Sequence, residues 1–127
     1  MARQIIATGN APSSPLFSQG VRIGSTIFVS GMAGIDPATG EPAGSSIGEQ
    51  TLQALRNCAS VLEAAGCSLD DVGFVTVLLA RPADFAGMNE AYGSVFSDRP
   101  PARAVTRLGP ELAGILVSIA MTAHIAE

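Results

Sequence analysis

The sequence of 127 residues contains no lysine, and all seven of its basic residues are arginine. This excludes mechanisms that need a lysine amine, such as Schiff-base catalysis or phosphate binding by a P-loop. Tryptophan is also absent, while histidine and tyrosine occur once each, as His124 and Tyr92. A histidine-rich metal site is therefore excluded, a Ser-His-Asp triad would have to use His124, and we expect neither a metal nor another cofactor.

Charge is scarce. Charged residues make up 14% of the sequence, whereas about 25% is usual for a soluble domain. Hydrophobic residues make up 47%, which excludes intrinsic disorder and predicts a well-filled core. A chain of this length forms one domain, and we expect residues 1–127 to do so. The low charge content predicts that part of the surface is buried between copies of the chain.

The net charge of −4 and the isoelectric point near 4.8 argue against nucleic acid as a partner, because phosphate binding needs a basic surface. The longest apolar run, residues 72–80, is far shorter than the ~20 residues of a membrane helix. Since the N-terminus carries no export signal, we expect a cytoplasmic protein without a membrane partner. Cys58 and Cys67 lack a CxxC spacing and lie among apolar residues, so they are predicted to be reduced core residues.

Strand and helix patterns alternate along the chain. The first helix is predicted to begin at Ser46, which forms a capping box with Glu49, and to end at Gly66. The second opens at residues 82–84, breaks at residues 98–101, and presents an apolar side made of Phe85, Met88, Tyr92 and Phe96. A turn is predicted at residues 36–42. Strands are predicted at residues 3–8, 21–23, 25–30, 72–80, 102–108 and 116–125, the third of them ending at Gly31.

Two helices cannot cover both faces of such a sheet, so we expect an α+β domain with both helices on one face. The strand at residues 72–80 is apolar on both sides, which predicts a central strand that is covered on both faces. The second cover would come from another copy of the chain in a closed ring or dimer.

Two arginines share one face of a predicted strand. Arg103 follows two prolines that fix the backbone, and Val105 and Arg107 lie on the same face by the two-residue alternation. Two guanidinium groups on one face suit a planar carboxylate. The alternative is that one or both lie solvated at an edge, paired with an acidic neighbour.

The last strand has a polar face that carries Ser118, Ala120, Thr122 and His124. His124 is the only histidine and is a candidate for proton transfer, but a histidine so near the end of a chain is more often exposed. Asn89 and Ser30 are candidate site residues that could equally be ordinary caps or core hydrogen-bonding groups.

Seven short segments, spread in order over nearly the whole chain, form a specific set. They are Asn10-Ala11-Pro12, Ser18-Gln19-Gly20-Val21, Val29-Ser30-Gly31, Asp36-Pro37-Ala38-Thr39-Gly40, Leu62-Glu63-Ala64-Ala65-Gly66, the stretch 84–92, and Pro101-Ala102-Arg103. Together they resemble the Rid (YjgF) family. The resemblance implies a chorismate-mutase-like (ferredoxin-like) fold with a mixed sheet, a homotrimer with sites between subunits, and hydrolysis of enamines and imines such as 2-aminoacrylate to a 2-keto acid and ammonia.

The resemblance also implies roles for individual residues. Arg103 matches the family arginine that binds the substrate carboxylate, and Ser30, Gly31 and Asn89 match positions that line the pocket. Phe17 stands in place of a tyrosine and Val105 in place of a cysteine. Ser118 stands where the family deaminases carry the glutamate thought to activate water, so the carboxylate anchor is present and the usual proton-handling group is not.

Three functions follow as hypotheses. The first is an imine deaminase with weak or altered activity, in which Ser118 orients water. The second is a non-catalytic protein that binds small carboxylates such as 2-keto acids through Arg103. The third, a ribonuclease, reflects a label carried by some relatives, and the acidic composition argues against it.

Overall fold

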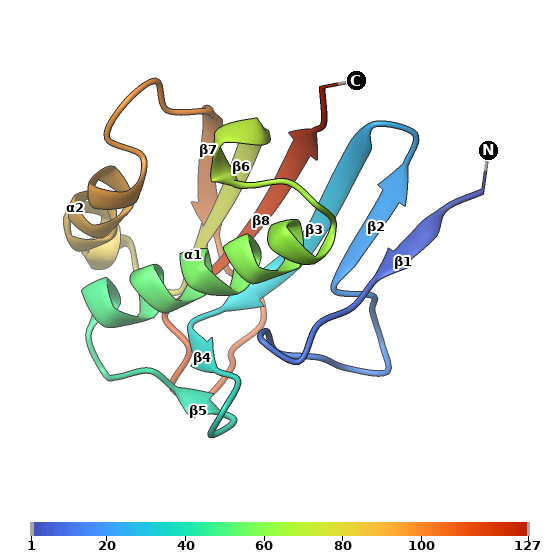
Figure 1. Ribbon diagram of the computed structural model, residues 1–127. Helices are drawn as coiled ribbons and strands as arrows, with labels where there is room; N and C mark the ends of the chain where they lie inside the picture. The colour runs from blue at the N-terminus through green and yellow to red at the C-terminus, as the bar shows by residue number, and fades with distance from the viewer. Residues whose placement is uncertain (1, 127) are drawn as a thin grey trace.

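A six-stranded sheet forms the centre of the computed structural model, which describes residues 2–126 (Figure 1). Its strands lie in the order β1 (Gln4–Ile6), β2 (Gly20–Ile23), β3 (Thr26–Ala33), β8 (Val117–His124), β6 (Val72–Leu79) and β7 (Ala102–Arg107). Neighbours are antiparallel except for β6 and β7, which are parallel. The sheet is therefore mixed, as predicted.

Both long helices, α1 (Ile47–Ala64) and α2 (Phe85–Val95), cover the same face of this sheet (Figure 1). The predicted capping box starts α1: Glu49 N donates to Ser46 Oγ at 3.1 Å, and Ser46 N donates to the Glu49 carboxylate at 3.3 Å. Gly66 follows the helix with φ of +84°, a left-handed conformation that favours glycine. The prediction of an α+β domain with both helices on one face is confirmed.

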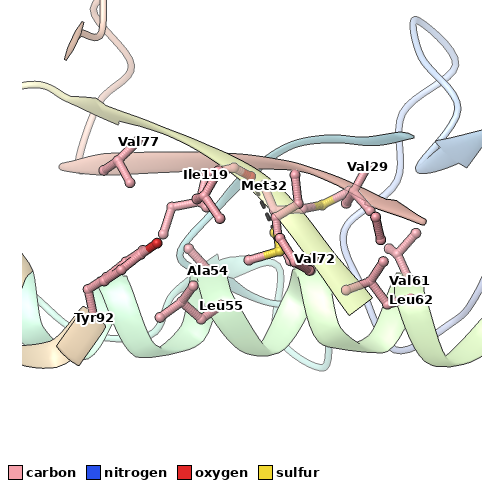
Figure 2. Close-up of a cluster of buried hydrophobic side chains, with 14 of the residues drawn as sticks. Val29, Met32, Ala54, Leu55, Val61, Leu62, Val72, Val77, Tyr92 and Ile119 are labelled. Atoms are coloured by element: carbon pink, nitrogen blue, oxygen red, sulfur yellow. Dashed lines mark hydrogen bonds between the residues drawn. The ribbon is translucent and has the colours of Figure 1, made fainter. Parts of the chain in front are cut away.

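The core lies between the helices and the sheet (Figure 2). Leu55 and Leu62 of α1 pack there with Ile119 of β8, and all three are at most 2% exposed. Cys58 lies among them, and its Sγ is 3.3 Å from the carbonyl oxygen of Ile119. Burial raises the pKa of the Cys58 thiol to about 12. Cys58 and Cys67 are both free and buried, as predicted.

The structure corrects the predicted end of the third strand. Gly31 does not end β3, which continues to Ala33. The register with β8 shifts between Val29 and Met32, so a β-bulge accommodates Ser30 and Gly31 inside the strand. Glycine was read as a stop, but in a strand it also marks a bulge.

Three further predictions need correction near the helices. The turn at residues 36–42 is flanked by two short paired strands, β4 (Ile35–Asp36) and β5 (Glu41–Pro42). The start of the second helix is a 3₁₀ turn, η2 (Pro82–Asp84), and another, η1 (Leu69–Asp71), precedes β6. Phe85 is 46% exposed, so it does not belong to the buried side that Met88, Tyr92 and Phe96 form.

The sheet face opposite the helices is open and carries several exposed apolar side chains beside the polar row of β8. Alternation along the paired strands places Ile5, Ile23, Phe28 and Phe74 on this face, each more than 40% exposed. Strand β6, predicted to be central and covered on both faces, lies inside the sheet next to the edge strand β7, and this chain covers only one of its faces. Across residues 2–126, no helix combines the length and hydrophobicity needed to cross a bilayer.

Candidate functional site

Arg103 projects from the edge strand β7 onto the helix-covered face and is half-buried. Its Nη1 donates to Asn89 Oδ1 at 2.8 Å and lies 4.0 Å from Met88 Sδ. The guanidinium carbon stands 4.8 Å from the centroid of the Tyr92 ring. Three residues of α2 thus hold one end of the guanidinium and leave its other donors for a further partner.

None of the residues that hold Arg103 is acidic. The one salt bridge within residues 2–126 joins Arg81 to Asp84 elsewhere in the fold. The alternative that Arg103 is paired with an acidic neighbour is therefore wrong for the described residues. A half-buried cation without a counter-ion, with free N–H groups in a planar fork, is an arrangement that binds a carboxylate.

The Tyr92 ring forms a cation–π contact with the Arg103 guanidinium. Tyr92 is 6% exposed, and its ring contacts that of Phe96 at a tilt of 43°, with the centroids 4.9 Å apart. Figure 2 shows its phenol end directed inward among the core side chains. Burial raises the pKa of Tyr92, and the nearby charge of Arg103 opposes that shift. Within the described residues its hydroxyl has no hydrogen-bond partner.

A hollow of about 260 Å³ lies against the second half of β7. Val105, which lies on the same strand face as Arg103, lines this hollow. The lining is mainly apolar and is completed by Leu79, Pro82, Phe85, Thr106 and Arg107. Arg103, Val105 and Arg107 therefore share a face, as predicted, and Asn89 joins them from α2.

Ser118 lies on the other face of the sheet. The alternating burial of β8 directs Val117 and Ile119 to the core and Ser118 to the open face. Gly31 lies across from it in the β3 bulge: a Cβ at Gly31 would stand 2.9 Å from Ser118 Oγ. A glycine here leaves the space in which the Ser118 hydroxyl sits.

Ser30 and Phe17 lie near this second group. The Ser30 hydroxyl donates to the Ser18 carbonyl at 2.6 Å, and Ser30 N donates to the Gln19 carbonyl at 3.0 Å. These bonds dock the segment that carries Phe17, whose side chain is 42% exposed.

Gln19 fixes the loop in front of that segment. Its amide nitrogen donates to the carbonyl oxygens of Thr8, Ala11 and Pro12, and its amide oxygen accepts from Thr8 N at 2.7 Å. Gln19 is 4% exposed. In the sequence, the only signal for this role of Gln19 is its place in the segment Ser18-Gln19-Gly20-Val21.

The predicted site residues therefore fall into two groups on opposite faces of one sheet. Arg103 pairs in register with Val75, a core residue on the helix side, whereas Ser118 pairs with Leu78 on the open side. The structure brings Arg103 together with Asn89 and Val105, and Ser118 together with Gly31. It does not bring the two groups together within one chain.

The remaining candidates lie apart from both groups. His124 is exposed at the end of β8, where it pairs with Thr26. No cluster of three or more potential metal ligands occurs in the described part of the chain. Sequence reasoning placed Met88 and Tyr92 on the apolar side of the second helix and missed their contacts with Arg103. The same helix side that packs on the sheet also holds the Arg103 side chain.

Comparison with known proteins gives a consistent result. The model of a family described as Endoribonuclease L-PSP matches residues 8–125. A RutC family protein of Saccharolobus solfataricus is 41% identical over 124 residues, 96% of this chain and 98% of that protein. A Mus musculus protein named 2-iminobutanoate/2-iminopropanoate deaminase is 38% identical over 118 residues, 92% of this chain and 87% of its own. The crystal structure of E. coli TdcF with bound serine is 30% identical, with a TM-score of 0.90 over 97% of this chain and 99% of that one.

Proposed function

Because the chain belongs to the Endoribonuclease L-PSP family, which includes the Rid (YjgF) and RutC proteins, we propose that it hydrolyses small enamines and imines of the 2-aminoacrylate and 2-iminopropanoate type. The products are a 2-keto acid and ammonia. The observation that carries the proposal is the half-buried guanidinium of Arg103, which has no carboxylate partner among residues 2–126. Relatives named as imine deaminases at about 40% identity support it.

The reaction needs a carboxylate anchor and an oriented water. An enamine first becomes the imine, as its terminal carbon gains a proton and its nitrogen loses one. The water oxygen then adds to the imine carbon, the C=N electron pair moves to nitrogen, and nitrogen takes up the proton that the water loses. In the resulting carbinolamine the hydroxyl proton passes to nitrogen, a C=O bond forms as the C–N bond breaks, and ammonia leaves. In this proposal Arg103 binds the substrate carboxylate, while Ser118 and backbone groups near Gly31 and Val105 orient the water.

Phe17 and Asn89 have supporting roles in the proposed site. The aromatic ring of Phe17 provides an apolar wall. Asn89 holds the Arg103 guanidinium through its 2.8 Å hydrogen bond and so fixes the position of the substrate carboxylate. Ser30 docks the segment that carries Phe17 through its bond to Ser18.

Ser118 makes slow turnover the expected result. A serine hydroxyl orients water but does not act as a base near neutral pH, and loss of a general acid or base typically costs about 10²- to 10⁴-fold in rate. Imines hydrolyse readily in water, so anchoring and orientation still accelerate the reaction.

We propose further that the site forms between subunits of a homotrimer. Arg103 and Ser118 lie on opposite faces of one sheet, so a single copy cannot present both to one substrate. The open face that carries Ser118 also carries the exposed Ile5, Ile23, Phe28 and Phe74, an apolar surface of the kind that marks an interface. A neighbouring copy seated there supplies Arg103 from its β7 edge.

The first experiment measures ammonia release from 2-iminopropanoate that an amino-acid oxidase generates in the assay. Wild-type protein accelerates hydrolysis, and Arg103→Ala abolishes the acceleration. Arg99→Ala removes the same charge from an exposed loop and leaves it unchanged. Ser118→Glu raises the rate by restoring a carboxylate. The absence of acceleration at high protein concentration, together with no effect of Arg103→Ala, would exclude deaminase activity.

A second experiment tests whether the site is shared. Arg103→Ala lacks the anchor, and Ser118→Phe fills the space beside Gly31 on the other half. Each variant alone is inactive, but co-expressed subunits form mixed trimers in which some sites combine an intact Arg103 with an intact Ser118 face. Recovered activity supports the shared site, whereas inactive mixed trimers, or a monomeric mass by sedimentation at micromolar concentration, contradict it.

The second candidate is a non-catalytic protein that binds 2-keto acids, and the serine at position 118 favours it. Calorimetry would then show 2-oxobutanoate binding that Arg103→Ala removes, with no turnover in either protein. Ribonuclease activity, which the family description names, would be supported by cleavage of single-stranded RNA that survives both stringent purification and Arg103→Ala.

A further inference from the structure

Arg107 is a second guanidinium on the strand face of Arg103 that the proposed reaction does not use. It lies at the end of β7 and is exposed. Its side chain takes part in no salt bridge or side-chain hydrogen bond within residues 2–126. It lines the apolar hollow of about 260 Å³ that Val105 also lines.

Arg107 lines this hollow, and Arg103 lies on the same strand face, two residues before Val105, which also lines it. Since β6 and β7 are parallel, α2 between them runs back along the strands. The guanidinium of Arg103 contacts Asn89 of α2. Phe85 lies one helical turn before Asn89, and the Cβ atoms of residues so spaced on a helix are about 6 Å apart. Arg107 lines the hollow at the Phe85 end. Between the two cations lie the apolar side chains of Val105 and Phe85.

The charge of Arg107 is not neutralised by the acidic residues around it. Asp84, next to the hollow, is paired with Arg81 at 2.9 Å. Glu111 lines another hollow on the far side of Arg107, but it forms no ion pair within the described residues. An uncompensated guanidinium at the rim of an apolar hollow favours an anionic ligand.

The hollow is also larger than a small substrate requires. Its volume of about 260 Å³ is several times the ~30 Å³ that one water occupies in the liquid. The methyl group of 2-iminopropanoate or the ethyl group of 2-iminobutanoate would leave most of it to solvent. A longer side chain that ends in an anion fits both the apolar wall and the cation at its end.

We propose that Arg107 binds a second carboxylate, so that the site takes dicarboxylic 2-imino and 2-keto acids with four or five carbons. This inference rests on the proposed function, in which Arg103 binds the carboxylate next to the reacting carbon. The methylene groups of the ligand then lie along Val105 and Phe85, and the distal carboxylate reaches Arg107. Arg107 is a specificity-determining residue here and takes no part in the chemistry.

The test is calorimetric binding of three stable 2-keto acids at low salt: 2-oxobutanoate, 2-oxoglutarate and 4-methyl-2-oxopentanoate. The wild-type protein binds 2-oxoglutarate about tenfold more tightly than 2-oxobutanoate, as expected for one added charge-assisted contact. Arg107→Gln removes this preference and leaves 2-oxobutanoate binding unchanged. Arg56→Gln removes the same charge from the exposed side of α1 and changes neither affinity. Arg103→Gln weakens all three.

The outcomes separate this inference from the proposed function. If 2-oxobutanoate binds through Arg103 but 2-oxoglutarate binds no better, or Arg107→Gln leaves the preference intact, the role of Arg107 is overturned and the proposed function stands. If 4-methyl-2-oxopentanoate binds most tightly, the hollow takes apolar side chains and the inference fails. If none of the three binds, the role of Arg107 is overturned, and the ammonia-release assay decides the proposed function separately.

Discussion

Raising the pH above 9 should destabilise this protein through one residue, Cys58. Its side chain is fully buried between α1 and β8, and burial raises the pKa of the thiol from 9.0 to about 12. In the unfolded chain the same thiol ionises near its ordinary value. Between these two values the unfolded state loses a proton that the folded state keeps, so ionisation favours unfolding.

The size of the effect follows from the two pKa values. The contribution of the protonated Cys58 thiol to stability is present in full well below pH 9 and is lost as the pH rises from 9 towards 12. One unit of pKa difference corresponds to about 1.4 kcal/mol, so the loss from Cys58 is about 2 kcal/mol at pH 10.5 and about 4 kcal/mol in full. This is a large part of the about 5–15 kcal/mol that stabilises a typical domain.

The assay is urea unfolding at pH 7.5, 9 and 10.5, at one protein concentration, for the wild-type protein and Cys58→Ala. The variant loses stability at every pH because it loses packing, so the comparison uses the slope with pH rather than the absolute values. Other groups, including Tyr92, titrate alike in both proteins and cancel. The wild-type protein should lose about 2 kcal/mol more than the variant between pH 7.5 and 10.5. Parallel profiles would refute this account of Cys58.

Two further substitutions test the packing near the site. Tyr92→Phe removes a buried hydroxyl that has no partner within the described residues, and it keeps the ring beside Arg103. The urea midpoint should therefore stay unchanged or rise. A loss of more than about 1 kcal/mol in the free energy of unfolding would mean that the hydroxyl has a hydrogen-bond partner. Gln19→Leu leaves the carbonyl groups of the loop before Phe17 without their buried donor and should cost about 3 kcal/mol in the same measurement. Gln53→Leu, which removes one half-buried bond to Asn57, is the control and should cost about 1 kcal/mol; equal losses would contradict the role given to Gln19.

Most of the fold could be predicted because its signals are local. The capping box of Ser46 and Glu49 marks the start of α1, and the two-residue alternation of β8 assigns each residue to a face. The bulge at Gly31 was missed because the register depends on the partner strand, which local sequence does not reveal. Phe85 was grouped with Met88 on one apolar side because their spacing is helical, but Phe85 is 46% exposed and lines the hollow along β7.

For the candidate site, the sequence predicted the strand face of single residues but not how those residues are arranged in space. Alternation placed Arg103, Val105 and Arg107 on one face, and the structure agrees. Ser118 lies on the opposite face of the sheet from Arg103, which only the order and register of the strands reveal. Strands β8, β6 and β7 lie side by side in the sheet, although β8 comes last in the chain. The support of Arg103 by Tyr92 depends on the crossing of α2 over β7, and no single-sequence pattern reports such a crossing.

The edge position of β7 has a consequence for solubility. An edge strand presents unpaired backbone groups on which a strand of another molecule can add, and natural proteins limit this with prolines and charged side chains. Here Pro100 and Pro101 precede the strand, and Arg103 and Arg107 place two like charges along it. Two copies that approached edge to edge would bring four uncompensated guanidinium groups together. The same arginines that leave this edge open to a small anion thus keep it closed to strand addition and aggregation.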